Sequence, residues 1–118
     1  MTEINIDEHT KGVLVFAKSK YPEKHNDWVV LIHHVEPYID VTTGKKCLRI
    51  LRHIACDMEH GMHFFSTYKN NPGYWGNAED YTLYTPTEEQ KEIIRNLLVA
   101  KKCKFIRAFN KVIPNNAI

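Results

Sequence analysis

The chain has 118 residues, of which 43% are hydrophobic, 25% charged and 11% aromatic. This length fits one domain with a core of its own, and the composition excludes an intrinsically disordered chain. The formal net charge of +2 is too small to require a nucleic-acid or membrane partner.

The sequence has few cysteines, no secretory-signal pattern and no long apolar stretch, and these features bear on location. The three cysteines are too few and too widely spaced to predict a disulfide framework. The N-terminus carries acidic residues and lacks the pattern of a secretory signal, and the longest apolar stretch, at 28–32, is too short to cross a bilayer. We therefore expect a cytoplasmic protein without a membrane partner. One globular domain is predicted over residues 1–114, with a frayed tail over residues 115–118.

The first predicted element covers residues 7–21. Its apolar residues recur at helical spacing, Asp7 can serve as N-cap, and Pro22 ends the pattern. A short strand over Val13 to Ala17 is the competing interpretation, because Gly12 and a run of β-favouring residues fit that as well. The helix is favoured.

The central segment predicts strands. Residues 28–35 form an apolar run that indicates a buried strand, which residues 38–41 continue, and Gly44 fits a hairpin turn over residues 42–45. Residues 47–58 fit a helix or a strand by periodicity. Lysines would begin such a helix and acids would end it, against the helix dipole. Two strands, over residues 47–56 and 62–68, are therefore predicted.

The C-terminal third begins with a loop over residues 70–80, where Gly, Pro and Asn are dense. Residues 85–88, Thr-Pro-Thr-Glu, predict a capping box with Pro86 at the first helical position. An apolar stripe then indicates an amphipathic helix, and residues 105–113 form a further element of uncertain type. The predicted fold is α+β: an antiparallel sheet of three to five strands, with an N-terminal helix and a C-terminal amphipathic helix on one face.

Seven histidines offer two kinds of site. Imidazole and thiolate ligands make zinc conceivable within residues 53–63, but the paired-cysteine spacing of structural zinc sites is absent, so neither a metal nor a cofactor is expected. Histidines and carboxylates could instead form an acid–base site if the strands pair as predicted, although no nucleophile motif is present. The candidate metal ligands are His53, Cys56, His60 and His63; the candidate acid–base residues are His33, His34, Glu36, Asp40, His53 and Asp57.

Two basic clusters suggest nucleic-acid binding as an alternative function. Cations interleaved with aromatic residues suit a surface that follows phosphates and stacks bases. Cations at the C-terminal end of a helix, however, are expected without any ligand. The clusters are Lys45, Lys46, Arg49 and Arg52 around the hairpin, and Lys101, Lys102, Lys104 and Arg107 near the C-terminus.

The aromatic loop and the residues after it form the favoured binding site, consisting of Tyr74, Trp75, Tyr81 and Tyr84. Large aromatic side chains in a polar, Gly-rich loop are typical of protein-binding hot spots. We therefore expect a non-enzymatic protein that binds and modulates another macromolecule, with a protein partner favoured over nucleic acid. The richness in Lys, Asn and Ile fits a viral or mobile-element accessory factor, and a histidine-dependent hydrolase or nuclease is the enzymatic alternative.

Overall fold

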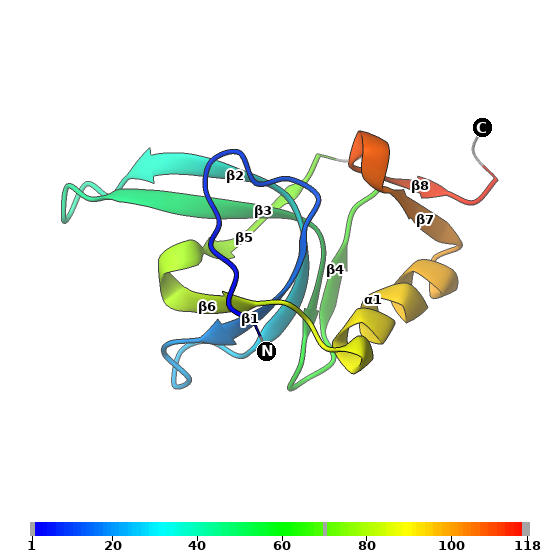
Figure 1. Cartoon of the computed structure of the whole chain (residues 1–118), viewed down its shortest axis with the longest axis horizontal. Coiled ribbons are helices and arrows are strands. Elements are labelled where there is room, and N and C mark those ends of the chain that lie inside the picture. Colours follow the sequence, from blue (N-terminus) through cyan, green and yellow to red (C-terminus); the bar gives the residue numbers. More distant parts are fainter. Residues whose placement is uncertain (1, 70, 117–118) are drawn as a thin grey trace.

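The computed structural model describes residues 2–69 and 71–116. Six strands form one antiparallel sheet, in which five follow the order β4-β3-β2-β1-β6 (Figure 1). The sixth, β5, pairs with the part of β3 that precedes its β4 partner. Two further strands form a hairpin. In chain order the elements are β1 (Leu14–Ser19), β2 (Trp28–Ile39), β3 (Lys46–Asp57), β4 (His63–Phe65), β5 (Gly73–Asn77), the 3-10 turn η1 (Ala78–Asp80), β6 (Tyr81–Tyr84), α1 (Glu88–Ala100), β7 (Cys103–Ile106), the 3-10 turn η2 (Arg107–Phe109) and β8 (Lys111–Pro114).

The sheet buries apolar residues on both of its faces, because successive side chains of a strand point to opposite sides. On one face Val15, Val30 and Ile32 pack with the side chains that β5 and β6 supply. On the other face Val29 packs against Ile94 of α1 and against the β7–β8 hairpin. Figure 1 shows α1 and the hairpin gathered at one end of the sheet, with the β2–β3 turn projecting at the other. The continuous apolar run of β2 is thus explained by burial on both faces.

A pair of bulges interrupts the β2–β3 ladder near its middle. Leu31 pairs with Ile54, Ile32 with Arg52, and His34 with Leu51. One residue is therefore skipped on each strand, and the two skipped residues are His53 and His33. A bulge re-aims side chains that a regular strand would point to opposite faces.

The N-terminal helix predicted over residues 7–21 is wrong. Residues 14–19 form β1, which is hydrogen-bonded between β2 and β6. The β-favouring run that supported the competing interpretation decides the outcome, because Val15, Phe16 and Ala17 are all buried when they alternate between the two faces. A helix would have presented only one stripe to the core.

The C-terminal helix of the prediction is also wrong in its place. The amphipathic helix exists as α1, but it is the only α-helix among the described residues and it lies before the β7–β8 hairpin. The chain therefore ends in strands, and the main sheet has six of them rather than three to five. The predicted loop over residues 70–80 contains β5 and η1, because its flanking polar residues conceal a short strand that pairs with β3.

The N-cap of α1 is Thr87 and not Thr85, where the predicted capping box begins. Thr87 is the N-cap: its hydroxyl accepts a hydrogen bond from the Gln90 amide at 3.2 Å, and the Gln90 side chain accepts one from the Thr87 amide at 2.9 Å. Pro86 precedes the cap and does not occupy the first helical position. The capping box thus forms with Gln90 rather than with Glu88.

Other predictions for the sheet are confirmed. The segment 46–57 is a strand, and the turns between strands contain Gly44 and Gly61 with positive φ. A second strand follows, but it covers only residues 63–65 of the predicted 62–68. The three cysteines are free and buried. Of the tail predicted to fray, residues 117–118 lie outside the described residues. Within the described chain, no helix has the length and apolarity needed to span a membrane.

Candidate functional site

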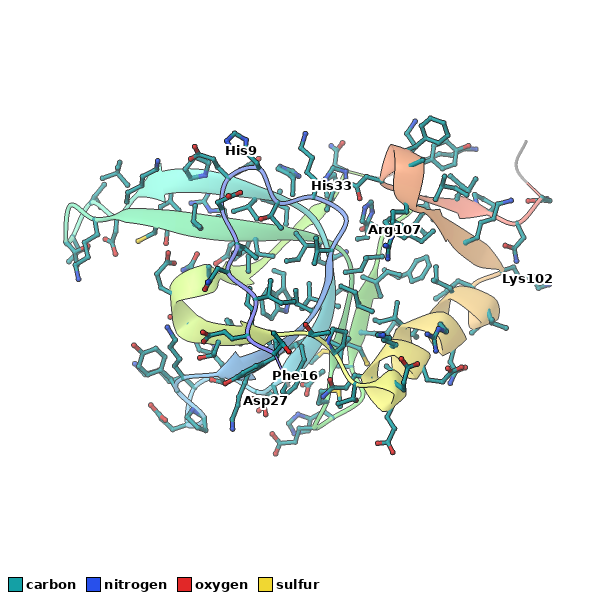
Figure 2. The ribbon with its side chains drawn as sticks, in the orientation of Figure 1. His9, Phe16, Asp27, His33, Lys102 and Arg107 are labelled. Atoms are coloured by element: carbon teal, nitrogen blue, oxygen red, sulfur yellow. The ribbon has the colours of Figure 1, made fainter. Side chains whose placement is uncertain are left out.

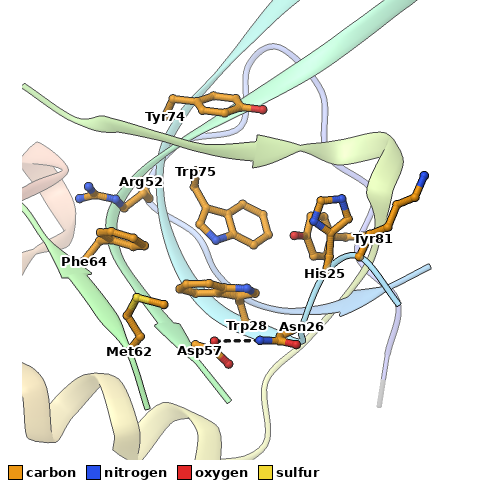
Figure 3. A pocket seen from close by; sticks show the side chains of 11 residues that line it. His25, Asn26, Trp28, Arg52, Asp57, Met62, Phe64, Tyr74, Trp75 and Tyr81 are labelled. Atoms are coloured by element: carbon orange, nitrogen blue, oxygen red, sulfur yellow. Dashed lines mark hydrogen bonds between the residues drawn. The ribbon is translucent and has the colours of Figure 1, made fainter. Parts of the chain in front are cut away.

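An open aromatic pocket of about 350 Å³ lies on the face of the sheet opposite α1. Four strands supply its walls: Trp28 begins β2, Phe64 lies in β4, Trp75 in β5, and Tyr81 begins β6. Figure 3 shows these rings around the pocket, with Met62 beside Phe64 at its edge. The pocket draws together aromatic residues that are far apart in sequence.

The rings of this aromatic pocket hold one another in place. The Trp28 ring lies 5.9 Å from that of Phe64 at an interplanar angle of 15°, and 6.1 Å from that of Trp75 at 71°. Trp75 also packs on Tyr81 at 4.5 Å, and Tyr81 is only 7% exposed. Aromatic pairs at these separations stabilise one another beyond their buried area. The pocket is therefore preformed, with the exposed Phe64 as its outermost ring.

The floor of the pocket is fixed by Asp57, whose side chain is buried. Asp57 accepts hydrogen bonds from the Asn26 side chain, from the backbone amides of Glu59 and His60, and from the His60 ring. Burial acts to raise the pKa of Asp57, but these hydrogen bonds outweigh it and lower the pKa to about 2. Asp57 is thus a satisfied carboxylate that ties down the β3–β4 turn.

Arg52 stands at the edge of the pocket with part of its hydrogen-bonding capacity unused. Its Nη1 donates to the Ser66 hydroxyl at 2.8 Å and to the His53 carbonyl at 3.3 Å, and its guanidinium lies over the Phe64 ring. Its Nε is buried and has no partner, and no ion pair among the described residues includes Arg52. A half-buried cation without an anion is costly unless an occupant supplies an acceptor.

A second depression, the histidine groove, has a volume of about 650 Å³ and lies between β2, β3 and the η2–β8 segment. The two skipped residues, His33 and His53, meet there with ring centroids 4.6 Å apart. His33 Nδ1 lies 2.7 Å from His34 Nδ1, and His34 Nε2 lies 2.9 Å from the Glu36 carboxylate. Asn110, with φ of 50°, closes the far side.

The direction of each hydrogen bond in this groove follows from the groups present. The Asn110 amide nitrogen donates to the His33 carbonyl, so its Oδ1 accepts from His53 Nε2 at 2.8 Å. Glu36 accepts from His34 Nε2, which leaves His34 Nδ1 to accept from His33 Nδ1. Burial, then the charges of His53, His34 and Lys11, lower the pKa of His33 to about 4. His33 is therefore neutral near pH 7.

The predicted aromatic site is only partly assembled. Trp75 and Tyr81 line the aromatic pocket, and Tyr74 reaches it from β5 with 55% of its surface exposed. Tyr84 lies on the opposite face, stacked on Phe16 with centroids 6.4 Å apart. It therefore belongs to the core beside α1. Trp75 is half-buried in the pocket wall, in β5 and not at the tip of an exposed loop.

The two basic clusters lie apart, and the first is spread along β3 from the projecting turn to Arg52 at the edge of the aromatic pocket. Lys45 and Lys46 flank the projecting β2–β3 turn, while Figure 2 shows Lys102 and Arg107 at the end that holds the hairpin, near Lys101 and Lys104. Arg49 is engaged with the rings of Tyr38 and Tyr74. The predicted residues therefore do not form one continuous basic surface.

The candidate metal ligands do not gather. His53 bonds Asn110 and His60 bonds Asp57, whereas Cys56 and His63 are partners across the β3–β4 ladder. In the described chain, no three His, Cys, Asp or Glu residues are placed to hold a metal ion. Four of the candidate acid–base residues are brought together: His33, His34 and His53 line the histidine groove, and Glu36 is hydrogen-bonded to His34. Asp40 lies at the β2–β3 turn and Asp57 is the last residue of β3, so neither joins them.

Several residues of these sites were not predicted. Trp28 reads as the first residue of a core strand, and Phe64 as part of a short strand, so neither signals a pocket. Asn110 shows no periodicity, although an Asn between two short apolar runs is a signal for positive φ.

In comparisons with known proteins, no family model matches the chain, and neither a curated protein nor a solved structure matches it significantly.

Proposed function

We propose that this protein binds another protein by taking an aromatic or large aliphatic side chain of that partner into the aromatic pocket. The observation that carries the proposal is the preformed set of rings from four strands, open to solvent on one side. Interface hot spots are enriched in Trp, Tyr and Arg, and they form where an anchor side chain fills a well-packed pocket.

Exposed apolar residues around the pocket support a contact surface larger than the pocket itself. Met62 is 53% exposed, Phe64 43% and Tyr74 55%, and all three line the pocket. Large apolar groups gathered at one opening are typical of a protein contact, whereas scattered ones are not. The partner would cover these side chains while its anchor enters between the rings.

Arg52 adds a requirement on the partner. Its guanidinium is half-buried, and no ion pair among the described residues supplies it with an anion. A carboxylate of the partner could pair with it in partly desolvated surroundings, where such a bond is strong. We therefore expect the bound segment to carry an Asp or Glu next to its anchor residue.

Charge favours a protein over nucleic acid as the partner. The vicinity of the pocket holds both signs: Lys24 and Arg52 line it, and Asp80 lies 3.7 Å from His25 at its side. Protein surfaces that bind nucleic acid are predominantly cationic, because each phosphate contact requires a positive partner.

The three free cysteines fit a reducing compartment, so we propose that this interaction occurs in the cytoplasm.

A displayed random-peptide library tests the proposal. Both tryptophans of the chain line the pocket, so intrinsic fluorescence reports its occupation directly. Selected peptides should share an aromatic or large aliphatic residue beside an acidic one, and should change the fluorescence on titration. Phe64→Ala should weaken their binding at least about 30-fold, as truncation of a hot spot does.

Phe109→Ala is the matched control, since Phe109 is an exposed phenylalanine outside this pocket. It should leave peptide affinity unchanged. Selection of peptides without a common anchor, or equal loss in both variants, would contradict the proposal. Tight, salt-sensitive binding of random single-stranded oligonucleotides that quenches the same tryptophans would favour the nucleic-acid alternative instead.

A further inference from the structure

The histidine groove contains a hydrogen-bonded relay that the binding function does not use. Glu36, His34 and His33 are linked in series, with donor and acceptor atoms 2.9 and 2.7 Å apart. Consecutive residues of a regular strand point to opposite faces, so this link exists only because His33 is the skipped residue of its bulge. Bulges that re-aim side chains are over-represented next to active sites.

The relay ends in a ring nitrogen that faces the groove. His33 Nδ1 donates to His34, which leaves Nε2 as the unprotonated nitrogen of the neutral ring. Among the described residues Nε2 has no hydrogen-bond partner, and it is not one of the buried unpartnered atoms. It is therefore accessible. The His53 ring packs against that of His33 and is itself fixed by Asn110 and by Phe105 at 5.6 Å.

The remaining lining indicates an anionic, base-bearing substrate. Lys11 and Lys111 supply cations. Glu8 is the only carboxylate among the described residues that line the groove, and it is paired with Lys46 at 3.3 Å. Tyr68 and Phe109 line the same groove and are 45% and 73% exposed. Cations that hold phosphate, together with exposed rings that stack bases, are the two components of a single-stranded nucleic-acid site.

We propose that the histidine groove cleaves RNA by internal transphosphorylation, with His33 as the general base that acts on a ribose 2′-hydroxyl. RNA is chosen over DNA because the groove offers a base for a hydroxyl of the substrate itself. Among its lining residues no carboxylate pair or cysteine is placed to activate a different nucleophile.

The chemical step is balanced within RNA and water. His33 Nε2 accepts the 2′-hydroxyl proton while its Nδ1 proton passes to His34, whose cationic ring is stabilised by the Glu36 carboxylate. The O2′–P bond forms and the P–O5′ bond breaks, giving a 2′,3′-cyclic phosphate, and the departing 5′-oxygen takes a proton from water. The relay then returns its proton to water. His33 is the catalytic residue; His34 and Glu36 are positioning residues that disperse the charge.

Incubation of a labelled single-stranded RNA oligonucleotide with the purified protein, in excess chelator, tests this proposal. We expect fragments that end in 2′,3′-cyclic phosphate, and no cleavage of the DNA oligonucleotide of the same sequence. His33→Gln should lower the cleavage rate about 100-fold or more, the usual contribution of a general base. Intact RNA, equal cleavage of DNA, or cleavage that requires an added metal would overturn the proposal.

His9→Gln is the matched histidine control, because its side chain is 85% exposed and outside the groove. It should cleave as the wild type does, and a wild-type rate in His33→Gln would overturn the assignment. Glu36→Gln keeps an acceptor for His34 but removes the charge. If Glu36 disperses the relay's charge, the acid limb of the pH–rate profile moves to lower pH; an unmoved profile would remove Glu36 from the relay.

A surface variant keeps the test valid if His33→Gln fails to fold, which circular dichroism would show. Lys11 and Lys111 are both exposed, so Lys11→Gln with Lys111→Gln should leave the fold intact. This double variant should reduce kcat/KM by at least about 10-fold and flatten its salt dependence. An unchanged kcat/KM would overturn the proposal. Phe64→Ala should not affect cleavage, so failure here is distinguishable from failure of the peptide site.

Discussion

Trp75 contributes both to the proposed binding pocket and to the stability of the fold. Its ring contacts Trp28 and Tyr81 but remains half-exposed. Trp75→Ala should therefore lower the free energy of unfolding by about 2 kcal/mol, less than the 3–5 kcal/mol typical of a fully buried aromatic residue. Urea denaturation followed by circular dichroism measures this. A loss below about 0.5 kcal/mol would support the exposed contact loop suggested by the sequence.

Asn110 joins two elements through one side chain. It accepts from His53 Nε2, donates to the His33 carbonyl and adopts a φ of 50°. Asn110→Ala should destabilise the protein by about 2–3 kcal/mol, because it leaves a buried ring nitrogen unpaired and places alanine in the left-handed region. Asn110→Gly loses the same hydrogen bonds without the backbone strain, so it should cost less. Equal losses in chemical denaturation would contradict the backbone contribution.

At the scale of elements, the start of α1 depends on one of two nearby threonines. Thr87→Ala removes the observed N-cap and should cost about 1 kcal/mol in the free energy of unfolding. Thr85→Ala, at the position where the sequence suggested the cap, is the control and should change stability by less than about 0.5 kcal/mol. Thermal denaturation of both variants decides between the two caps, and the reverse order would contradict the structure.

The elements that sequence could predict were those whose signals are local. The strands over 28–39 and 46–57 follow from hydrophobic runs and from charges that oppose a helix there. The first segment could not be decided, because its apolar residues fit both periods and only pairing with β2 and β6 makes it a strand. Such tertiary pairing overrides local propensity. β5 was hidden for the same reason, since its partner lies more than twenty residues earlier in β3.

The sequence could identify some residues of the candidate sites but not how those residues come together. Trp75 and Tyr81 were identified, yet Trp28 and Phe64 complete the pocket through pairing of distant strands, which no local pattern encodes. The convergence of His33, His34 and His53 depends on two bulges. A bulge shifts the register by one residue, and this chain carries no sequence signal for one. The sequence therefore could not show whether these histidines come together.

The whole molecule should lose stability in acid in two stages. The pKa of His33 falls from 6.5 to about 4 on folding, so the unfolded chain binds more protons between these values. The free energy of unfolding should therefore decrease as pH falls from 6.5 to 4. The pKa of Asp57 falls from 3.8 to about 2 on folding, and its contribution is lost over that lower range.

Melting temperatures measured across this range test the order of the two stages. His33 faces Lys11, His34 and His53, and Glu36 lies beyond His34, so among the described residues no carboxylate directly offsets a charge on His33. Burial also lowers the pKa of His53, so His33→Gln should reduce the upper stage without abolishing it, and should leave the lower stage unchanged. A variant that keeps the same decrease between pH 6.5 and 4 would show that another group is responsible.

The three buried thiols give the molecule built-in reporters of local opening. Cys47 lies near the projecting turn, Cys56 near the end of β3 between β2 and β4, and Cys103 in the β7–β8 hairpin, and each is 7–8% exposed. An alkylating reagent reaches a thiol only when its surroundings open, so the labelling rate at each cysteine measures the free energy of a different opening. The two-stranded hairpin should expose Cys103 through small fluctuations, whereas Cys56 should be labelled only when the sheet itself comes apart.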